Sequence, residues 1–172
     1  MKNTTLITIV ILSLAAIFAV IGIVNYYSNK DSGSSGPNVY SQSALTVEEN
    51  ATFDFGEVSM ANGNVSYKVK LANNGSEPTI INKVYTSCMC TTAMIDIKGE
   101  KSGPFGMPGH TIASSKSYLE VPAAETAEVE VIFDPTAHGP SGVGLAQRSV
   151  FIETNSTNSP MVELQFKAVV VK

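Results

Sequence analysis

The chain has 172 residues, of which 44% are hydrophobic, and it carries a formal net charge of −4. This length suits one domain of ordinary size with an appendage. Eleven basic and fifteen acidic residues, spread without long runs, argue against a nucleic-acid-binding surface. With no tryptophan, two histidines and the single arginine Arg148, the chain offers few of the usual catalytic side chains. We therefore expect a protein that is not an enzyme.

The N-terminal segment predicts a membrane anchor. Residues 6–24 read LITIVILSLAAIFAVIGIV and contain no charged residue. As a helix they would span roughly 28 Å, close to the hydrocarbon thickness of a bilayer. The run is longer than the apolar part of a usual signal peptide, no small-residue cleavage signal follows it, and Tyr26 and Tyr27 fit an interfacial aromatic belt. We predict an uncleaved transmembrane helix within residues 1–27; the alternative is a cleaved signal peptide.

The flanking charges and composition predict how the rest of the chain is arranged. Lys2 precedes the apolar run, whereas Lys30 beyond it is offset by Asp31. The positive-inside rule then favours a cytoplasmic N-terminus and an extracytoplasmic C-terminal domain in a single-pass protein of the cell membrane. Residues 28–44 are rich in Ser and Gly, which predicts a flexible linker. Residues 45–172 are predicted to form one exported domain.

The exported part shows the two-residue alternation of β-strands. Short strands with Gly, Asn and Pro turns and no helical stripe predict an all-β fold, an immunoglobulin-like β-sandwich of about seven strands. The predicted core includes Ile80, Val84, Val131, Phe166 and Val169. The clearest strand segments are residues 52–58, 65–71, 79–85, 127–133, 149–154 and 162–171.

Several of these stretches carry a resemblance to a known family. FDFGEV at residues 53–58, the run from Val65 to the motif SCMCT, and later VEVIFDPT and SVFIETN resemble the bacterial family called domain of unknown function 1573, over most of residues 52–170. The resemblance implies an immunoglobulin-like fold, related to the ASPM/SPD-2/hydin and major-sperm-protein modules, in an exported or membrane-anchored protein. Two features depart from the family pattern: Met89 stands between the cysteines where Gly is expected, and residues 99–115 form a Gly/Pro-rich stretch.

One constellation of residues could carry chemistry. Cys88 and Cys90 are followed by Met94, Met107 and His110, which together supply thiol, thioether and imidazole groups. Thiolates and thioethers are soft ligands that favour Cu(I), and imidazole suits copper or zinc. On an extended segment the two cysteines would point to the same face, and glycines in residues 103–109 would let the loop fold back toward them. A Cu(I) site at these five residues is therefore one interpretation of the sequence.

Other interpretations of the same residues stay open. Cysteine is often a small buried hydrophobe, and methionine fills gaps in cores. Exported thiols also tend to oxidise, although two cysteines separated by one residue would need a tight turn to form a disulfide. Thiol–disulfide exchange is a further possibility, but its usual motif has two intervening residues. Structural zinc is weakly supported because the usual pairs of Cys-x-x-Cys are absent.

The Gly-rich stretch at residues 139–144 lacks the strand, helix and lysine of a phosphate-binding loop, so we expect a long turn there, with His138 as a solvated residue beside it. Together these features predict a non-catalytic extracytoplasmic binding or scaffolding module, held at the membrane, that contacts another envelope protein through loops or a sheet edge. The alternative is storage or delivery of Cu(I) through the Cys/Met/His residues.

Overall fold

The computed structural model describes residues 20, 40–110 and 116–172. The predicted anchor over residues 1–27 and most of the predicted linker lie outside these ranges, apart from the single residue at position 20. Within the described ranges no helix is long and apolar enough to cross a membrane. Residues 39–172 form one compact unit.

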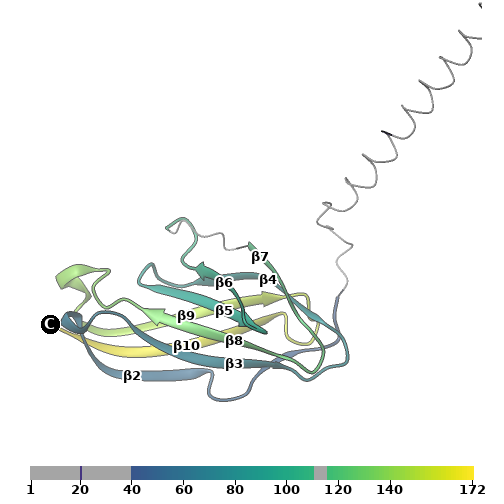
Figure 1. Cartoon of the computed structure of the whole chain (residues 1–172). Helices are drawn as coiled ribbons and strands as arrows, with labels where there is room; N and C mark the ends of the chain where they lie inside the picture. The colour runs from purple at the N-terminus through teal and green to yellow at the C-terminus, as the bar shows by residue number, and fades with distance from the viewer. Residues whose placement is uncertain (1–19, 21–39, 111–115) are drawn as a thin grey trace, which may run out of the picture. The chain divides into compact units, whose positions relative to one another are not determined.

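The described part of this unit is built from strands and two short 3-10 helices, which confirms the all-β class (Figure 1). In chain order the elements are β1 (Leu45–Val47), β2 (Thr52–Ser59), η1 (Met60–Asn62), β3 (Val65–Asn73), β4 (Thr79–Thr86), β5 (Thr91–Ile97), β6 (Glu100–Phe105), β7 (Lys116–Val121), β8 (Thr126–Phe133), η2 (Gly139–Gly142), β9 (Gly144–Thr154) and β10 (Met161–Val171).

The strands form two five-stranded sheets, in the orders β1-β3-β8-β5-β6 and β2-β10-β9-β4-β7. Strands β2 and β10 run parallel, and the other neighbouring strands are antiparallel. Two such sheets are consistent with the predicted immunoglobulin-like sandwich. The described residues contain more strands than the seven expected, because β1, β5, β6 and β7 are short or lie next to the cysteine motif and the Gly/Pro-rich stretch.

In most strands, buried and exposed residues alternate as the sequence pattern predicts. Two residues that were predicted to lie in the core, Ile80 and Val169, do not. Along β10 the even-numbered residues are buried, whereas Val169 lies on the outer face and is 44% exposed. In β4 the register with both neighbouring strands shifts between Ile81 and Lys83. Because this β-bulge reverses the alternation, Ile81 and Val84 both face the core and Ile80 turns outward to a half-buried position.

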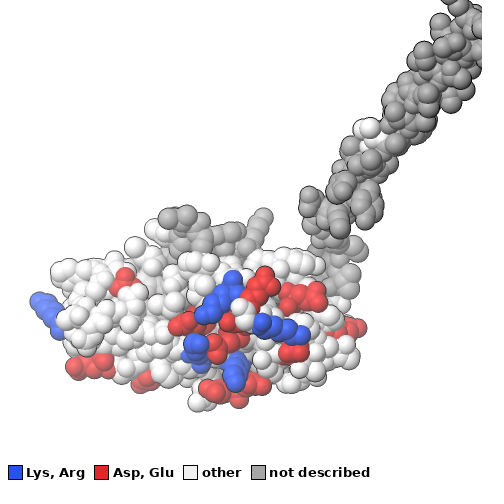
Figure 2. All heavy atoms as spheres, in the orientation of Figure 1, with Lys and Arg blue, Asp and Glu red and all other residues white. Residues whose placement is uncertain are grey.

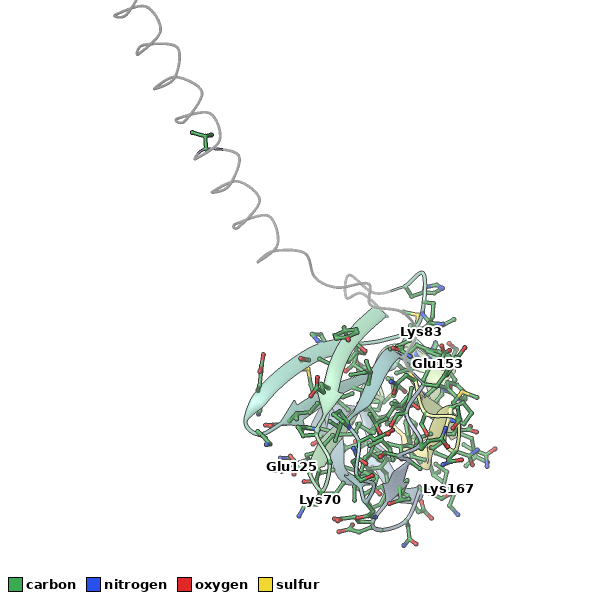
Figure 3. The ribbon with its side chains drawn as sticks, turned by 90° about the vertical axis from the view of Figure 1, so that its right-hand side faces the viewer. Lys70, Lys83, Glu125, Glu153 and Lys167 are labelled. Atoms are coloured by element: carbon green, nitrogen blue, oxygen red, sulfur yellow. The ribbon has the colours of Figure 1, made fainter. Side chains whose placement is uncertain are left out.

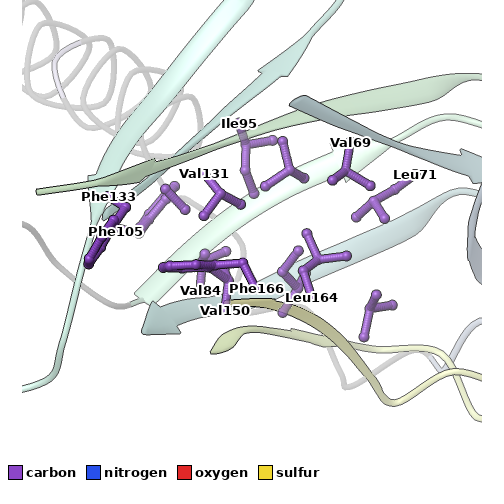
Figure 4. Packing of buried hydrophobic residues seen from close by; sticks show 14 of the residues in the cluster. Val69, Leu71, Val84, Ile95, Phe105, Val131, Phe133, Val150, Leu164 and Phe166 are labelled. Carbon is purple, nitrogen blue, oxygen red and sulfur yellow. The ribbon is translucent and has the colours of Figure 1, made fainter. Parts of the chain in front are cut away.

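The core lies between the two sheets. Figure 4 shows Val69, Ile95 and Val131 on one side, facing Val150 and Leu164 on the other. All five side chains are buried. This interdigitation of the inner faces is the usual packing of a β-sandwich, and it supplies the main stabilisation of the domain.

Two ends of the sandwich close the core where the chain crosses between sheets. We call them the serine pole (residues 40–43, 73–79, 121–126 and 154–160) and the thiol pole (residues 86–91, 105–110 and 133–144). Strand β4 connects them, since it begins beside Asn155 and ends immediately before the cysteine motif. At the serine pole Ser41 is buried and pairs with Ser156 in an isolated β-bridge.

The outer faces of the sheets carry dispersed charges. Figure 2 shows acidic and basic side chains mixed over the face on which β3, β5 and β8 lie in Figure 1. Lys68 and Glu128 form an ion pair there at 2.6 Å. On the other sheet Lys83 lies beside Glu153, with the charged atoms 3.3 Å apart (Figure 3). On the visible face the two signs of charge are mixed.

Candidate functional site: a dithiol at the crossover between the sheets

Cys88 and Cys90 lie in the turn that takes the chain from β4 in one sheet to β5 in the other. The backbone N–H of Thr91 donates to the carbonyl of Cys88 at 3.1 Å, which closes a four-residue turn. The two sulfur atoms are 2.6 Å apart, and both cysteines are free thiols. The expectation of an extended segment is therefore wrong: a tight turn, and not strand alternation, brings the thiols together.

Three strands hold this turn in place. The buried hydroxyl of Thr86 lies 2.9 Å from the carbonyl of Cys88 and donates into the turn. Directly after β8, the N–H of Asp134 donates to the carbonyl of Cys90 at 2.9 Å. From β9, Ser149 accepts a hydrogen bond from the N–H of Ser87, also at 2.9 Å. The backbone around the thiols is thus fixed mainly by its neighbours, and within the turn Cys88 Sγ also accepts a hydrogen bond from the N–H of Cys90 at 3.4 Å.

Two ionisable side chains from distant parts of the chain approach the thiols. His138 follows β8 at the start of η2, and its Nε2 lies 3.1 Å from Cys88 Sγ. Arg148 of β9 donates from Nε to Cys90 Sγ at 3.3 Å. The ligand atoms of Cys88, Cys90 and His138 all lie within 4.8 Å of one another. The site therefore combines two soft sulfur donors, one imidazole and one adjacent guanidinium group.

The surrounding groups shift the pKa values of the two thiols in opposite directions. Burial raises the pKa of Cys88, but hydrogen bonds from Cys90, His138 and Arg148 outweigh it and lower that pKa to about 7. Burial raises the pKa of Cys90, and the hydrogen bond with Cys88 raises it further. Although burial lowers the pKa of Arg148, hydrogen bonds to the two thiols raise it above its ordinary value. In the metal-free protein, Cys88 is therefore the thiol that ionises first.

The structure does not bring Met94 to the thiols. Met94 lies on the outward side of β5, between the buried residues Ala93 and Ile95. It lies opposite Glu130 of β8 and lines a small surface hollow with charged side chains that include Lys101. Strand alternation separates it from the site, because residues of β5 that face outward cannot turn to the end of the sandwich.

Met107 and His110 lie at the thiol pole, in the turn after β6. The carbonyl of Gly106 accepts a hydrogen bond from Thr86, the residue that supports the cysteine turn, at 3.3 Å. Met107 is half-buried and His110 is exposed. Among the described His, Cys, Asp and Glu side chains, the cluster at the thiols contains His138 and not His110. His138 is exposed, as the sequence predicts, but it also contacts a thiol, which the sequence analysis missed.

The fold and the site together define an immunoglobulin-like module with a dithiol at one end. The profile of the family described as "Protein of unknown function (DUF1573)" matches residues 45–104, a range that contains β1 to β5 and the cysteine motif. The resemblance seen in the sequence is confirmed over these residues, whereas VEVIFDPT and SVFIETN lie beyond the match. No curated protein matches the sequence.

Solved structures with similar folds share little sequence with this chain. A protein of unknown function from Porphyromonas gingivalis has 14% identity and a TM-score of 0.56, and the match covers 80% of this chain and 51% of that one. The chain thus spans about half of that protein. The ASH/PapD-like domain 7 of human CEP192 has 12% identity, coverage of 82% and 92%, and a TM-score of 0.44. The first likeness supports the two-sheet fold.

Proposed function

We propose that this domain binds Cu(I) through Cys88, Cys90 and His138, as a non-catalytic module that stores or delivers the metal. The observation that carries the proposal is the approach of these three ligand atoms to within 4.8 Å of one another. Two thiolates and one imidazole match the donor preferences of Cu(I). They come from the β4–β5 and β8–β9 connections, so the fold itself assembles the site.

The charge at the site favours a monovalent metal. Two thiolates and Cu(I) carry a net charge of −1, and the guanidinium of Arg148, hydrogen-bonded to Cys90 Sγ, would neutralise it. The same thiolates with Zn²⁺ are already neutral, so Arg148 would leave an uncompensated positive charge. Arg148 is the only arginine of the chain. Its position at the thiols therefore supports Cu(I) over zinc.

Metal binding would require a small rearrangement of the thiols. At metal–sulfur distances of about 2.3 Å, two sulfurs in a trigonal site lie roughly 4 Å apart. The sulfurs of Cys88 and Cys90 are 2.6 Å apart, so they would have to separate by more than an ångström. Rotation about the side-chain bond of Cys90 can provide this, since hydrogen bonds to the carbonyls of Cys88 and Cys90 hold the turn.

Cu(I) titration of the full chain in detergent, under reducing conditions and in competition with a chromogenic Cu(I) chelator, tests the proposal. We expect one tightly bound Cu(I) per chain. Cys88→Ser and Cys90→Ser should each weaken binding at least about 100-fold, since losing even an orienting residue costs about 10- to 100-fold. His138→Gln should weaken binding by less, because the two thiolates remain.

Two matched variants serve as controls. His110→Gln makes the same change at the other histidine, and Met94→Leu replaces a thioether that the structure places on the outer sheet face. We expect both to bind Cu(I) like the wild type. Equal binding by wild type and Cys88→Ser, or a larger loss with His110→Gln than with His138→Gln, would contradict the assigned ligands.

We further propose that an uncleaved N-terminal helix holds the module on the extracytoplasmic side of the membrane, where another envelope protein would supply or receive the metal. The uninterrupted apolar run of residues 6–24 supports this proposal. N-terminal sequencing of membrane-extracted protein should find the apolar run intact. A mature chain that begins after Val24 would show instead that the segment is a cleaved signal peptide.

A further inference from the structure

We infer that the dithiol also reduces disulfide bonds by thiol–disulfide exchange, with Cys88 as the attacking thiol and Cys90 as the resolving thiol. This activity does not require copper, and it stands or falls independently of the metal site. Its substrate class is an accessible disulfide, either of a small molecule or on the surface of another protein.

The contact between the sulfurs is the first argument. Cys88 Sγ and Cys90 Sγ are 2.6 Å apart in a turn whose carbonyls are held by Thr86 and Asp134. A mixed disulfide formed on Cys88 would therefore have the second thiol beside it. Reactants held in contact in this way react as if at very high concentration. The second step would outpace attack by any free thiol in solution.

The unequal accessibility of the sulfurs is the second argument. Cys88 retains 9% of its surface, whereas Cys90 retains 2%. Cys88 is contacted by the exposed side chain of His138 and precedes Met89, which is 46% exposed, so an incoming disulfide approaches Cys88 past exposed side chains. Cys90 lies beneath Arg148, whose Nε donates to its sulfur. Cys88 is therefore the thiol that a substrate can reach, and Cys90 lies beside it as the second thiol.

The reaction balances in two steps. The Cys88 thiolate attacks one sulfur of a substrate disulfide, that S–S bond breaks, and the other sulfur leaves as a thiolate. The Cys90 thiolate then attacks the Cys88 sulfur, which breaks the mixed disulfide and releases the second substrate thiolate. The substrate gains two electrons, the two cysteine protons finish on the two released thiols, and Cys88 and Cys90 end as a disulfide.

The test uses the full chain in detergent, stripped of metal with chelators and incubated with oxidised glutathione. We expect the wild type to release two reduced glutathione molecules per chain and to lose two hydrogens in mass, with peptide mapping that joins Cys88 to Cys90. Cys90→Ser should stop as a mixed disulfide on Cys88. Cys88→Ser should form its mixed disulfide at least about tenfold more slowly, because exchange follows access to the thiol.

Three outcomes would overturn the inference: a wild type that stays reduced, a wild type that accumulates glutathione on both cysteines, or single variants that react at equal rates. Circular dichroism establishes that the serine variants are folded, and the wild-type mapping decides the disulfide independently of them. Because the assay contains no copper, its failure would leave the Cu(I) site standing. Failure of copper binding would likewise leave the exchange reaction standing.

Discussion

The two poles of the sandwich close the same core with different chemistry. At the serine pole, buried polar side chains bond mainly to the backbone. At the thiol pole, the buried sulfurs bond mainly to one another and to the ionisable side chains of His138 and Arg148, and Cys88 Sγ has one backbone donor, the N–H of Cys90. Polar groups saturated by fixed backbone partners serve the architecture. Thiols whose partners are mostly side chains can exchange those partners for a ligand, which is why both proposals concern the thiol pole.

Asn73 shows how completely the serine pole is saturated. Its side chain is fully buried, and its amide nitrogen lies within 3.1 Å of the carbonyls of Glu77, Val121 and Pro122. Its amide oxygen accepts from the N–H of Gly75. One side chain thus ties β3 to the start of β4 and to the end of β7. Both polar atoms of this side chain therefore have backbone partners.

The largest expected effect comes from breaking the core on which both poles depend. Val131 is 2% exposed, so Val131→Asp buries an unpaired charge and should cost roughly 3 kcal/mol or more of the free energy of unfolding. Val169→Asp makes the same change at a side chain that is 44% exposed and should cost less than about 1 kcal/mol. Chemical denaturation of both variants checks the prediction. Equal costs would mean that the register of β8 or β10 is wrong.

The next prediction tests whether the two poles are independent of each other. Asn73→Ala removes the amide donor that the carbonyls of Glu77, Val121 and Pro122 share, and it should lower the free energy of unfolding by about 2–3 kcal/mol. Copper affinity and the reactivity of Cys88 should not change at temperatures where the variant is folded. Asn74→Ala, which removes an exposed hydrogen bond to Thr46, is the matched control and should cost no more than about 0.5 kcal/mol. A loss of copper binding in folded Asn73→Ala would show that the poles are coupled.

The prediction with the smallest effect on the fold concerns the ionisation of the two thiols at the thiol pole. In the metal-free chain the pKa of Cys88 is lowered to about 7, because hydrogen bonds from Cys90, His138 and Arg148 outweigh burial. The thiolate is the reacting form, so the rate of alkylation by iodoacetamide should rise with pH and level off above a midpoint near 7. Because the pKa of Cys90 is raised, its alkylation should follow only at higher pH.

The variant Arg148→Gln tests what lowers the pKa of Cys88. It removes a hydrogen-bonding cation from the thiols, so the midpoint for Cys88 should move to higher pH. Mass spectrometry of the alkylated peptides distinguishes the two cysteines. A midpoint at the ordinary thiol pKa in the wild type would mean that neighbouring side chains do not stabilise the Cys88 thiolate.

The strands that could be predicted are those whose alternation is long and uninterrupted. Residues 65–71 and 127–133 were predicted from their pattern, and they pair in β3 and β8 with Val69 opposite Val129. Residues 79–85 were also recognised, but the inserted residue near Asn82 reverses their faces. A bulge depends on both neighbouring strands, and nothing in the local sequence marks it. This is why Ile80 was placed in the core and Ile81 was not.

The thiols of the candidate site could be predicted, but their partners could not. Cys88 and Cys90 are recognisable by chemistry and spacing alone. His138 reaches them only because β5 pairs with β8 in antiparallel register, with Thr91 opposite Phe133. The residues after Phe133 are thereby brought beside the residues before Thr91. Because β5 was not recognised, and because Arg148 lies in a part of β9 that was expected to be loop, neither contact could be predicted from the sequence.

The position of the chain ends has a practical consequence for studying the site. Ser41, beside the first described residues of the domain, is fixed to the β9–β10 turn, whereas Lys172 at the C-terminus lies where β10 runs past the start of β9 (Figure 1). The eight residues of β4, roughly 25 Å of extended chain, separate the first end from the cysteines. Immobilisation through a residue near Ser41 therefore leaves the thiols open to reagents. A bulky C-terminal fusion would crowd them, so metal or redox assays should avoid one.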